Sequence, residues 1–338
     1  MFCNSTITDL FLFVFTQLIL HYQFFGTAVY TMENNNILDY INLSESGLTK
    51  SEIQQLYSYD TQQINIEQIE QIKVNVIILV KNQEKLIKKA IDSVLSIADN
   101  IYVFDTGSTD GTKKVVASYP EKVHLSEKEW VEDYSYMRNY AMKNITEGEW
   151  IFIIDSDESL KTKFSQLEFK IMLYLLDYVA NLKNIVLTIR QESQENSIVG
   201  YPQRIFKKNS NLNFYGVVHE ELRAPIIKNI STEITLHNLG TATEEIKKFD
   251  KVKRYNNLLL KNIQNEPLYI KWFALLDYDF GKENLPDYHK RMDFFCKLIQ
   301  KNKSNITYRD DVFEMTLLAK KIYDNILNQK FDEAKQNI

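Results

Sequence analysis

Two patterns of apolar and polar positions alternate through the middle of the chain. Nearly continuous apolar runs rich in β-branched residues are typical of strands buried on both faces, and they occupy 74–80, 101–104 and 150–154. A further short strand is predicted at 123–125. Segments with apolar residues at helical spacing lie between them, at 86–98, 112–119 and 133–145. Strands that alternate with helices predict an α/β fold with a doubly wound, mostly parallel sheet.

The flanking segments have a different character. Apolar residues at helical spacing in 37–71 predict a small helical lead-in, which we bound at 32–71. The part from 184 to 240 is mixed, with strand-like segments at 185–189 and 213–218. From about residue 243 the chain is helical and aromatic, with a rhythm similar to tetratricopeptide units and a polar helix over 329–338. The predicted division is therefore a sheet domain over 72–242 and a helical C-terminal region over 243–338.

The first 31 residues form an apolar extension. The run at 10–20 is too short for a membrane span, and no Lys or Arg precedes it as in a secretory signal. Met32 begins a polar segment, so we interpret residues 1–31 as an upstream extension and Met32 as the true start. A membrane anchor is the alternative, and membrane association is expected only if residues 1–31 belong to the natural protein.

Charge and cysteine content narrow the function classes. The chain has 40 basic and 45 acidic residues and a net charge of −5, which implies no broad basic surface and no nucleic-acid partner. Its two cysteines, Cys3 and Cys296, cannot build a disulfide framework. Cys296 follows two phenylalanines and is expected to be buried. We therefore expect a reducing compartment, the cytoplasm.

Two acidic loops follow predicted strands. Asp155 and Asp157, two residues apart, can both reach one hard cation that bridges pyrophosphate oxygens, although a solvated acidic turn has the same sequence. Asp105 ends another strand and can accept hydrogen bonds from a uracil or ribose edge. Gly107 and Gly111 permit a tight turn there, and an ordinary strand-to-helix turn is the alternative. In a parallel sheet both loops lie at the same edge.

Some nucleotide folds are excluded by the loop after the first strand. It contains neither the glycine fingerprint of dinucleotide-binding folds nor the lysine motif of P-loop proteins. This argues against a dinucleotide oxidoreductase and against a P-loop kinase.

Taken as a set, these stretches resemble family 2 glycosyltransferases of the GT-A fold. The matching stretches are Val80-Lys81-Asn82-Gln83-Glu84, Ala90-Ile91-Asp92-Ser93-Val94, Asp105-Thr106-Gly107-Ser108-Thr109-Asp110-Gly111-Thr112 and Asp155-Ser156-Asp157-Glu158. Further stretches are similar to a branch that includes lipopolysaccharide-core glucosyltransferases and bacteriocin-modifying enzymes, namely the segments 130–139, 204–207, 215–221 and 237–240. The lead-in and the Asn-Glu-Pro-x-x-x-Lys-Trp stretch at 265–272 look most like the sublancin-type peptide S-glycosyltransferases.

The resemblance implies a nucleotide-sugar donor, UDP-glucose or a close relative, with Mg²⁺ or Mn²⁺. It implies Asp157 and a late histidine as metal ligands, with His237 the better match and His219 its rival. Because family 2 enzymes invert the anomeric centre, a base must face the acceptor, and Glu220 is our candidate. The resemblance places the nucleotide-sugar contacts on Val80, Asn82, Glu84, Asp105, Arg138 and Asp155.

Three functions remain open. The first is transfer of a hexose to a Cys or Ser side chain of a bacteriocin-like peptide, by an enzyme that could form a homodimer. The second is a glycosyltransferase for a cell-envelope saccharide of the lipopolysaccharide-core type. The third, from another class, is an inactive GT-A scaffold or binding module, against which the intact Asp155 and Asp157 speak.

Overall fold

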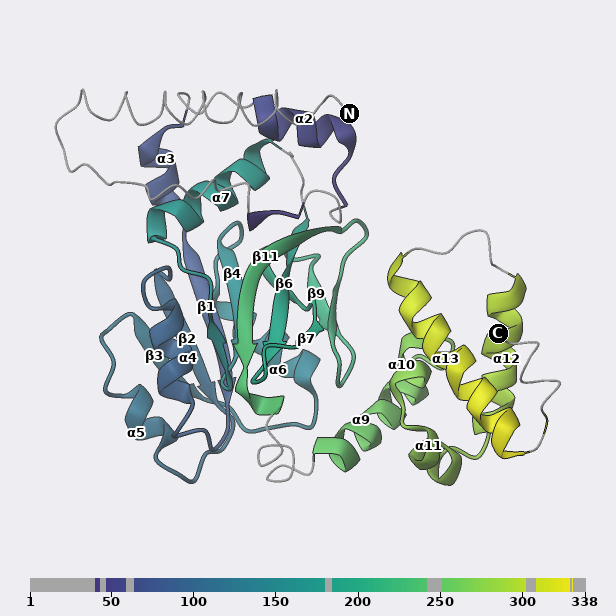
Figure 1. Ribbon diagram of the computed structural model, residues 1–338. Coiled ribbons are helices and arrows are strands. Elements are labelled where there is room, and N and C mark those ends of the chain that lie inside the picture. Colours follow the sequence, from purple (N-terminus) through teal and green to yellow (C-terminus); the bar gives the residue numbers. More distant parts are fainter. Residues whose placement is uncertain are drawn as a thin grey trace. The chain divides into compact units, whose positions relative to one another are not determined.

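The computed structural model describes most of the chain (Figure 1). The described residues are 40–42, 47–58, 64–179, 184–241, 251–301, 308–328 and 330. The extension at 1–31 lies outside them, as does the predicted polar helix at 329–338 except for residue 330. The chain divides into two compact units, which we describe separately. The first comprises 1–130, 138–213 and 222–241, and the second comprises 131–137, 214–221 and 242–338.

A nine-stranded sheet organises the first unit, in the order β3-β2-β1-β4-β8-β6-β11-β5, with β7 paired to β6. Strands β1 to β4 are mutually parallel, and β6 and β11 run in the same direction, whereas β5, β7 and β8 run against them. The strands are β1 (Val74–Val80), β2 (Asn100–Asp105), β3 (Val123–Glu127), β4 (Trp150–Asp155), β5 (Glu158–Leu160), β6 (Ile185–Ser193), β7 (Ile198–Gly200), β8 (Gln203–Lys207) and β11 (Lys228–Asn238). The predicted α/β fold with a mostly parallel sheet is confirmed.

Helices pack on the sheet because its strands are apolar on both faces. Alternate residues of β1 and β4, such as Val76 and Phe152, join the main core with buried residues of α4 (Ile87–Val94) and α7 (Gln166–Val179). On strand β2, Phe104 meets the ring of Tyr140 edge-on at 6.2 Å between centroids. The remaining helices in the described part of this unit are α2 (Lys50–Ser58), α3 (Ile66–Gln71), α5 (Thr112–Val116), the short 3₁₀ turns η3 (Met142–Asn144) and η4 (Leu239–Thr241), and α6 (Tyr134–Ala141), which begins in the second unit.

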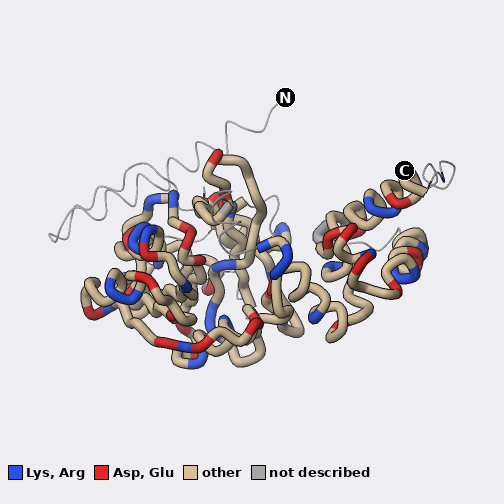
Figure 2. Tube along the Cα trace, turned by 90° about the horizontal axis from the view of Figure 1, so that it is seen from below, with Lys and Arg blue, Asp and Glu red and all other residues tan. Residues whose placement is uncertain are grey.

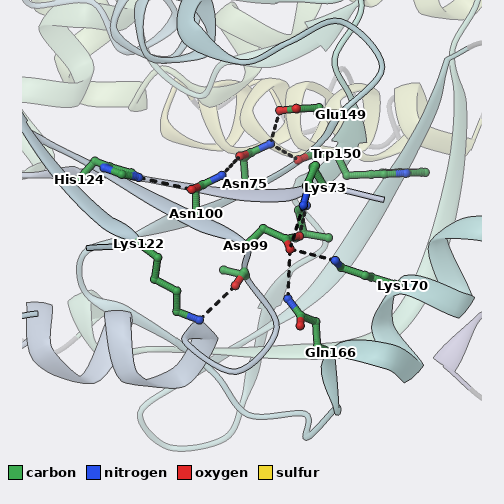
Figure 3. Close-up of polar contacts among 12 residues, drawn as sticks. Lys73, Asn75, Asp99, Asn100, Lys122, His124, Glu149, Trp150, Gln166 and Lys170 are labelled. Carbon is green, nitrogen blue, oxygen red and sulfur yellow. Dashed lines mark hydrogen bonds and ion pairs between the residues drawn. The ribbon is translucent and has the colours of Figure 1, made fainter. Parts of the chain in front are cut away.

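Polar side chains tie the amino ends of the strands together (Figure 3). The fully buried Asn75 of β1 donates to Glu149 Oε2 at 2.8 Å and accepts from Asn100 Nδ2 at 3.1 Å. Nearby, Asp99 accepts from the Val74 backbone at 2.8 Å and, through its other oxygen, from Lys170 of α7 at 2.9 Å. These bonds fix the amino ends of the strands, which lie at the edge of the sheet opposite to the carboxyl ends.

The second unit is helical, as predicted for the C-terminal region. It contains α9 (Lys251–Asn265), α10 (Ile270–Leu275), α11 (Tyr278–Asn284), α12 (Tyr288–Lys301) and α13 (Tyr308–Leu327). Its core is aromatic, and its largest fully buried side chains are Trp272, Phe273, Tyr288 and Phe295. Acidic and basic residues are interspersed along both units (Figure 2). Among the described helices, none is both long enough and apolar enough to cross a membrane.

The segment at 213–218 differs from the predicted strand. Strand β9 (Asn213–Tyr215) ends after three residues and pairs with β10 (Glu221–Arg223) in a small separate sheet. The strand stops because Gly216 has φ +95° and His219 has φ +52°, which no extended strand contains. The connecting loop instead inserts Val217 and Val218 into the helical core of the second unit.

Candidate functional site

The carboxyl edge of the parallel strands brings the two predicted acidic loops together. Asp105 lies opposite Val80 across the β1–β2 pair, and Asp155 lies opposite Leu79 across the β1–β4 pair. Their strands flank β1, so the two backbones are separated by two strand spacings, about 10 Å. The Val80 carbonyl accepts from Thr106 N at 2.8 Å, which continues the β1–β2 contact into the loops. The edge therefore presents carboxylates on both sides of one central strand.

The loop that follows β1 is bonded to the loop that follows β2. Asn82, with φ +52°, donates its backbone N–H to Ser108 Oγ at 2.8 Å and accepts from Thr109 N at 2.7 Å. Glu84 Oε2 accepts from Gly111 N at 2.7 Å. Two predicted nucleotide-binding residues, Asn82 and Glu84, thus shape the walls of the edge by holding one loop against the other.

Asp105 has one satisfied and one unsatisfied carboxylate oxygen. The residue is fully buried, and its Oδ1 accepts from the backbone of Gly107 at 2.9 Å and of Ser108 at 2.7 Å. Gly107 has φ +106°, so glycine suits this turn. Within the described part of the chain, Oδ2 is buried and accepts no hydrogen bond. A buried acceptor left unpaired is costly, so this atom is suited to a donor group of a ligand.

Asp155 is held by two arginines. Its Oδ1 accepts from Arg138 Nη2 at 3.1 Å and its Oδ2 from Arg204 Nη2 at 2.8 Å, and both guanidinium groups are buried. Burial raises the pKa of Asp155, but the two guanidinium charges outweigh it and hold the pKa well below its usual range. Arg138, predicted to contact the nucleotide-sugar, pairs here with the first carboxylate of the Asp-x-Asp motif. The aspartate is therefore fixed as an anion.

Glu158 and Arg204 are site residues to which the sequence assigned no role. Arg204 Nη2 bridges Asp155 and Glu158, with Glu158 Oε1 at 2.7 Å, and the backbone of Asp155 donates to Glu158 Oε2 at 2.8 Å. Gln191 also donates to Glu158. Burial raises the pKa of Glu158 to about 7 against the opposing charge of Arg204. Both residues lie inside motifs that the sequence analysis matched to the family, so the sequence pointed to their importance. It did not show that they pair, because they are 46 positions apart.

The strand pairing brings Asp157 and His237 into one strip of the sheet. Strand β5 begins one residue after Asp157 and runs antiparallel to the end of β11, with His237 opposite Ser159. The Asp157 carbonyl accepts from Leu239 N at 2.8 Å. A Cβ added to Gly240 would lie 1.8 Å from Asp157 Oδ2, so the carboxylate rests directly against that glycine. A side chain at this position would therefore displace the Asp157 carboxylate from where it lies.

These two residues fit a divalent cation by their chemistry. His237 Nε2 is buried and has no hydrogen-bond partner among the described residues, which leaves a lone pair or N–H to be satisfied. A carboxylate and an imidazole are donors that Mn²⁺ and Mg²⁺ sites use. Among the described residues no cluster of three or more His, Cys, Asp and Glu side chains could hold a metal. A cation on Asp157 and His237 would take its further ligands from a phosphate group and water.

The predicted base and the rival histidine belong to the second unit. Glu220 and His219 lie in the loop between β9 and β10. Burial raises the pKa of Tyr134, and the charge of Glu220 makes a smaller contribution in the same direction. The Tyr134 hydroxyl accepts a hydrogen bond from Arg254 at 2.8 Å. The ring of His219 meets Tyr255 edge-on at 5.6 Å between centroids. His219 is thus part of an aromatic cluster around the loop.

Comparison with known proteins shows which family the sequence around the acidic loops matches. Residues 75–173, which include both acidic loops, match the family model described as Glycosyl transferase family 2. Residues 75–173 are thus a family 2 glycosyltransferase domain. This confirms the resemblance inferred from the motifs. Over 247 residues the chain is 27% identical to the SPbeta prophage-derived glycosyltransferase SunS of Bacillus subtilis (strain 168), an alignment that covers 72% of this chain and 57% of SunS.

Two other similarities concern smaller or more distant matches. An uncharacterized glycosyltransferase of Rickettsia bellii is 38% identical over 88 residues, which are 26% of this chain and 29% of that protein. The crystal structure of S. aureus TarS 1-349 in complex with UDP-GlcNAc aligns with a TM-score of 0.43 and 16% identity, covering 79% of this chain and 90% of that one. The chain spans little more than half the length of SunS.

Proposed function

We propose that the protein is an inverting, metal-dependent glycosyltransferase. It moves a hexose from a UDP-sugar, with UDP-glucose as the main candidate, to a Cys or Ser side chain of a bacteriocin-like peptide. The observation that carries the proposal is the carboxyl edge of the sheet, where Asp105 has an unpaired oxygen, Asp155 is a fixed anion, and Asp157 lies beside the end of β11 that carries His237. The family 2 domain and the likeness to SunS, which is named as a glycosyltransferase, support the same reaction class.

The donor half of the proposal assigns a role to each edge residue. Asp105 Oδ2 accepts from the uracil or ribose, because it is a buried acceptor in need of a donor. Asp155 keeps its negative charge between two arginines and accepts from the ribose hydroxyls. Val80, Asn82 and Glu84 keep the two loops in the shape that admits the nucleotide.

Asp157 and His237 would hold the divalent cation. When bound, Mg²⁺ or Mn²⁺ supplies positive charge that stabilises the departing UDP. Asp157 contributes its carboxylate from the turn between β4 and β5, and His237 its Nε2 from the end of β11. Gly240 leaves room for that carboxylate, because a Cβ at this position would lie 1.8 Å from Asp157 Oδ2.

The acceptor half of the proposal concerns Glu220. In an inverting transfer the acceptor sulfur or oxygen forms a bond to the anomeric carbon while the bond from that carbon to the diphosphate oxygen breaks. The acceptor proton passes to Glu220 and the electron pair leaves with UDP. A thiol needs less help from a base than a hydroxyl, because it ionises far more readily. A Cys acceptor should therefore tolerate loss of Glu220 better than a Ser acceptor.

Intact mass measurement tests the proposal. Purified protein is incubated with Mn²⁺, one of several UDP-sugars, and either synthetic peptides that carry a single Cys or a single Ser or lipid-linked and free saccharides. We expect one hexose mass on the Cys or Ser peptide with UDP-glucose, and slower transfer with unchanged UDP binding for Glu220→Gln. A hexose added to a lipid-linked or free saccharide instead of any peptide would favour cell-envelope synthesis. No turnover of any UDP-sugar, with or without Mn²⁺, would refute the enzymatic role.

A further inference from the structure

The stretch Asn265-Glu266-Pro267-x-x-x-Lys271-Trp272 has no role in the proposed function so far. It connects α9 to α10 in the second unit, beside the loop 214–221. That loop carries Glu220 and contains two residues with left-handed backbone, Gly216 and His219. A loop of this conformation needs contacts from outside itself to be held in one position.

Lys271 makes the strongest of these contacts. Its side chain is buried, and its ammonium donates to the His219 carbonyl and to Glu221 Oε2, both at 2.7 Å. Tyr269 donates to the other oxygen of Glu221 at 2.6 Å. One buried cation and one phenol therefore hold the residues on either side of Glu220. A charge-assisted bond of this kind is stronger than a neutral one.

The base of the loop is held by α9 and by Trp272. Asn262 of α9 accepts from Val217 N at 2.6 Å and donates to the Val218 carbonyl at 2.9 Å. One amide side chain thus makes the two backbone hydrogen bonds that a neighbouring strand would otherwise make. A Cβ added to Gly216 would lie 2.5 Å from the fully buried Trp272 ring. Every residue from 216 to 219 thus meets the helical region through a backbone bond or a close packing contact.

We infer that Lys271 and Asn262 are positioning residues that hold the 214–221 loop and thereby set the position of Glu220 as the acceptor-side base. The inference rests on the proposed function. It explains why the aromatic helix α10 contains a buried lysine: the ammonium fixes the carbonyl before Glu220 and the carboxylate after it. The helical region then acts in the reaction by placing the base, in addition to any binding of the acceptor.

The test uses the full chain, with UDP-glucose and Mn²⁺ as the probe and water as the acceptor, whose deprotonation also needs a base. We compare Lys271→Met and Lys271→Arg with Lys282→Met, a control in the same unit whose ammonium lies over the Tyr278 ring, 5.0 Å from its centroid. Tyr269→Phe is a milder variant that removes one bond to Glu221. Hydrogen exchange of peptides covering 214–221 reports the loop directly, and titration with UDP reports the donor site.

Lys271→Met should lower kcat for UDP-glucose hydrolysis at least tenfold, with the affinity for UDP within twofold of wild type. Exchange in 214–221 should become at least tenfold faster, whereas exchange in the strands of the sheet stays unchanged. Tyr269→Phe should give a smaller loss, Lys271→Arg a partial recovery, and Lys282→Met the wild-type rate and exchange. A general loss of folding would accelerate exchange in all helices of the unit, and Tyr269→Phe then decides the question.

Two outcomes separate this inference from the proposed function. A wild type that turns over UDP-glucose while Lys271→Met and Tyr269→Phe keep its rate and its loop exchange overturns the positioning role alone. A wild type that turns over no UDP-sugar overturns the proposed function, and the positioning role with it.

Discussion

Gly216 offers a substitution whose cost follows from the local geometry. Its φ of +95° lies in the left-handed region, where an alanine costs about 1–2 kcal/mol. The added Cβ would also lie 2.5 Å from Trp272 Cη2 and 2.9 Å from Trp272 Cζ2. That ring is fully buried, so it cannot move aside without disturbing the helical core. Overpacking of this kind costs about 1–3 kcal/mol.

Gly216→Ala should therefore destabilise the protein by about 2–5 kcal/mol. Gly107→Ala is the matched control, because Gly107 has φ +106° but no atom lies within 4 Å of its added Cβ. Only the backbone cost of about 1–2 kcal/mol applies there. The difference between the two variants isolates the contact with Trp272.

Urea unfolding followed by circular dichroism measures both variants, and Gly216→Ala is repeated in a Trp272→Phe background. Because the smaller ring leaves room for the methyl group, the cost of Gly216→Ala should fall by about 1 kcal/mol or more in that background. Equal costs for Gly216→Ala and Gly107→Ala, together with no coupling to Trp272, would refute the close approach of the loop to α10.

Two further predictions concern buried charge. Arg204→Met leaves Glu158, whose side chain is fully buried, without its cation and should cost about 3–5 kcal/mol, whereas Lys88→Met, which breaks an exposed pair with Asp92, should cost under about 1 kcal/mol in the same urea assay. Similar costs would contradict the buried network. Burial lowers the pKa of Lys320 from its ordinary value of 10.5 to about 8. Between these two pH values Lys320 is protonated in the unfolded chain and neutral in the folded one, so the free energy of unfolding rises with pH over this range. The unfolding free energy of wild type minus that of Lys320→Met should increase from pH 7 to pH 10, and a flat or falling difference would contradict this burial.

Most of the parallel half of the sheet could be predicted from the sequence, because β1, β2 and β4 are nearly continuous apolar runs. Strand β1 occupies the predicted residues, and β4 extends the predicted run by one. Strands β5 and β8 were missed since β5 has only three residues and β8 has only two apolar residues, Ile205 and Phe206, between polar ones. Such strands are defined by their partners across the sheet and not by their own pattern.

The sequence identified individual candidate site residues, but it did not show which of them lie next to one another. The acidic loops could be located because parallel strands end at one edge. The pairing of His237 with Ser159, which brings the histidine to Asp157, depends on an antiparallel contact between β5 and β11. The attachment of the 214–221 loop to the helical region was also not visible. Its signal was a lysine inside an aromatic helix, whose partners lie about 50 positions earlier.

The central claim is that Asp157 and His237 hold a divalent cation that fixes the diphosphate of a UDP-sugar. Titration of UDP into the protein, in Mn²⁺ and in EDTA, tests this most directly. Wild type and Glu121→Gln, a substitution of an exposed carboxylate, should bind UDP at least tenfold more tightly with Mn²⁺. Asp157→Ala and His237→Ala should lose that enhancement while remaining folded. Full Mn²⁺ enhancement in Asp157→Ala would contradict the account.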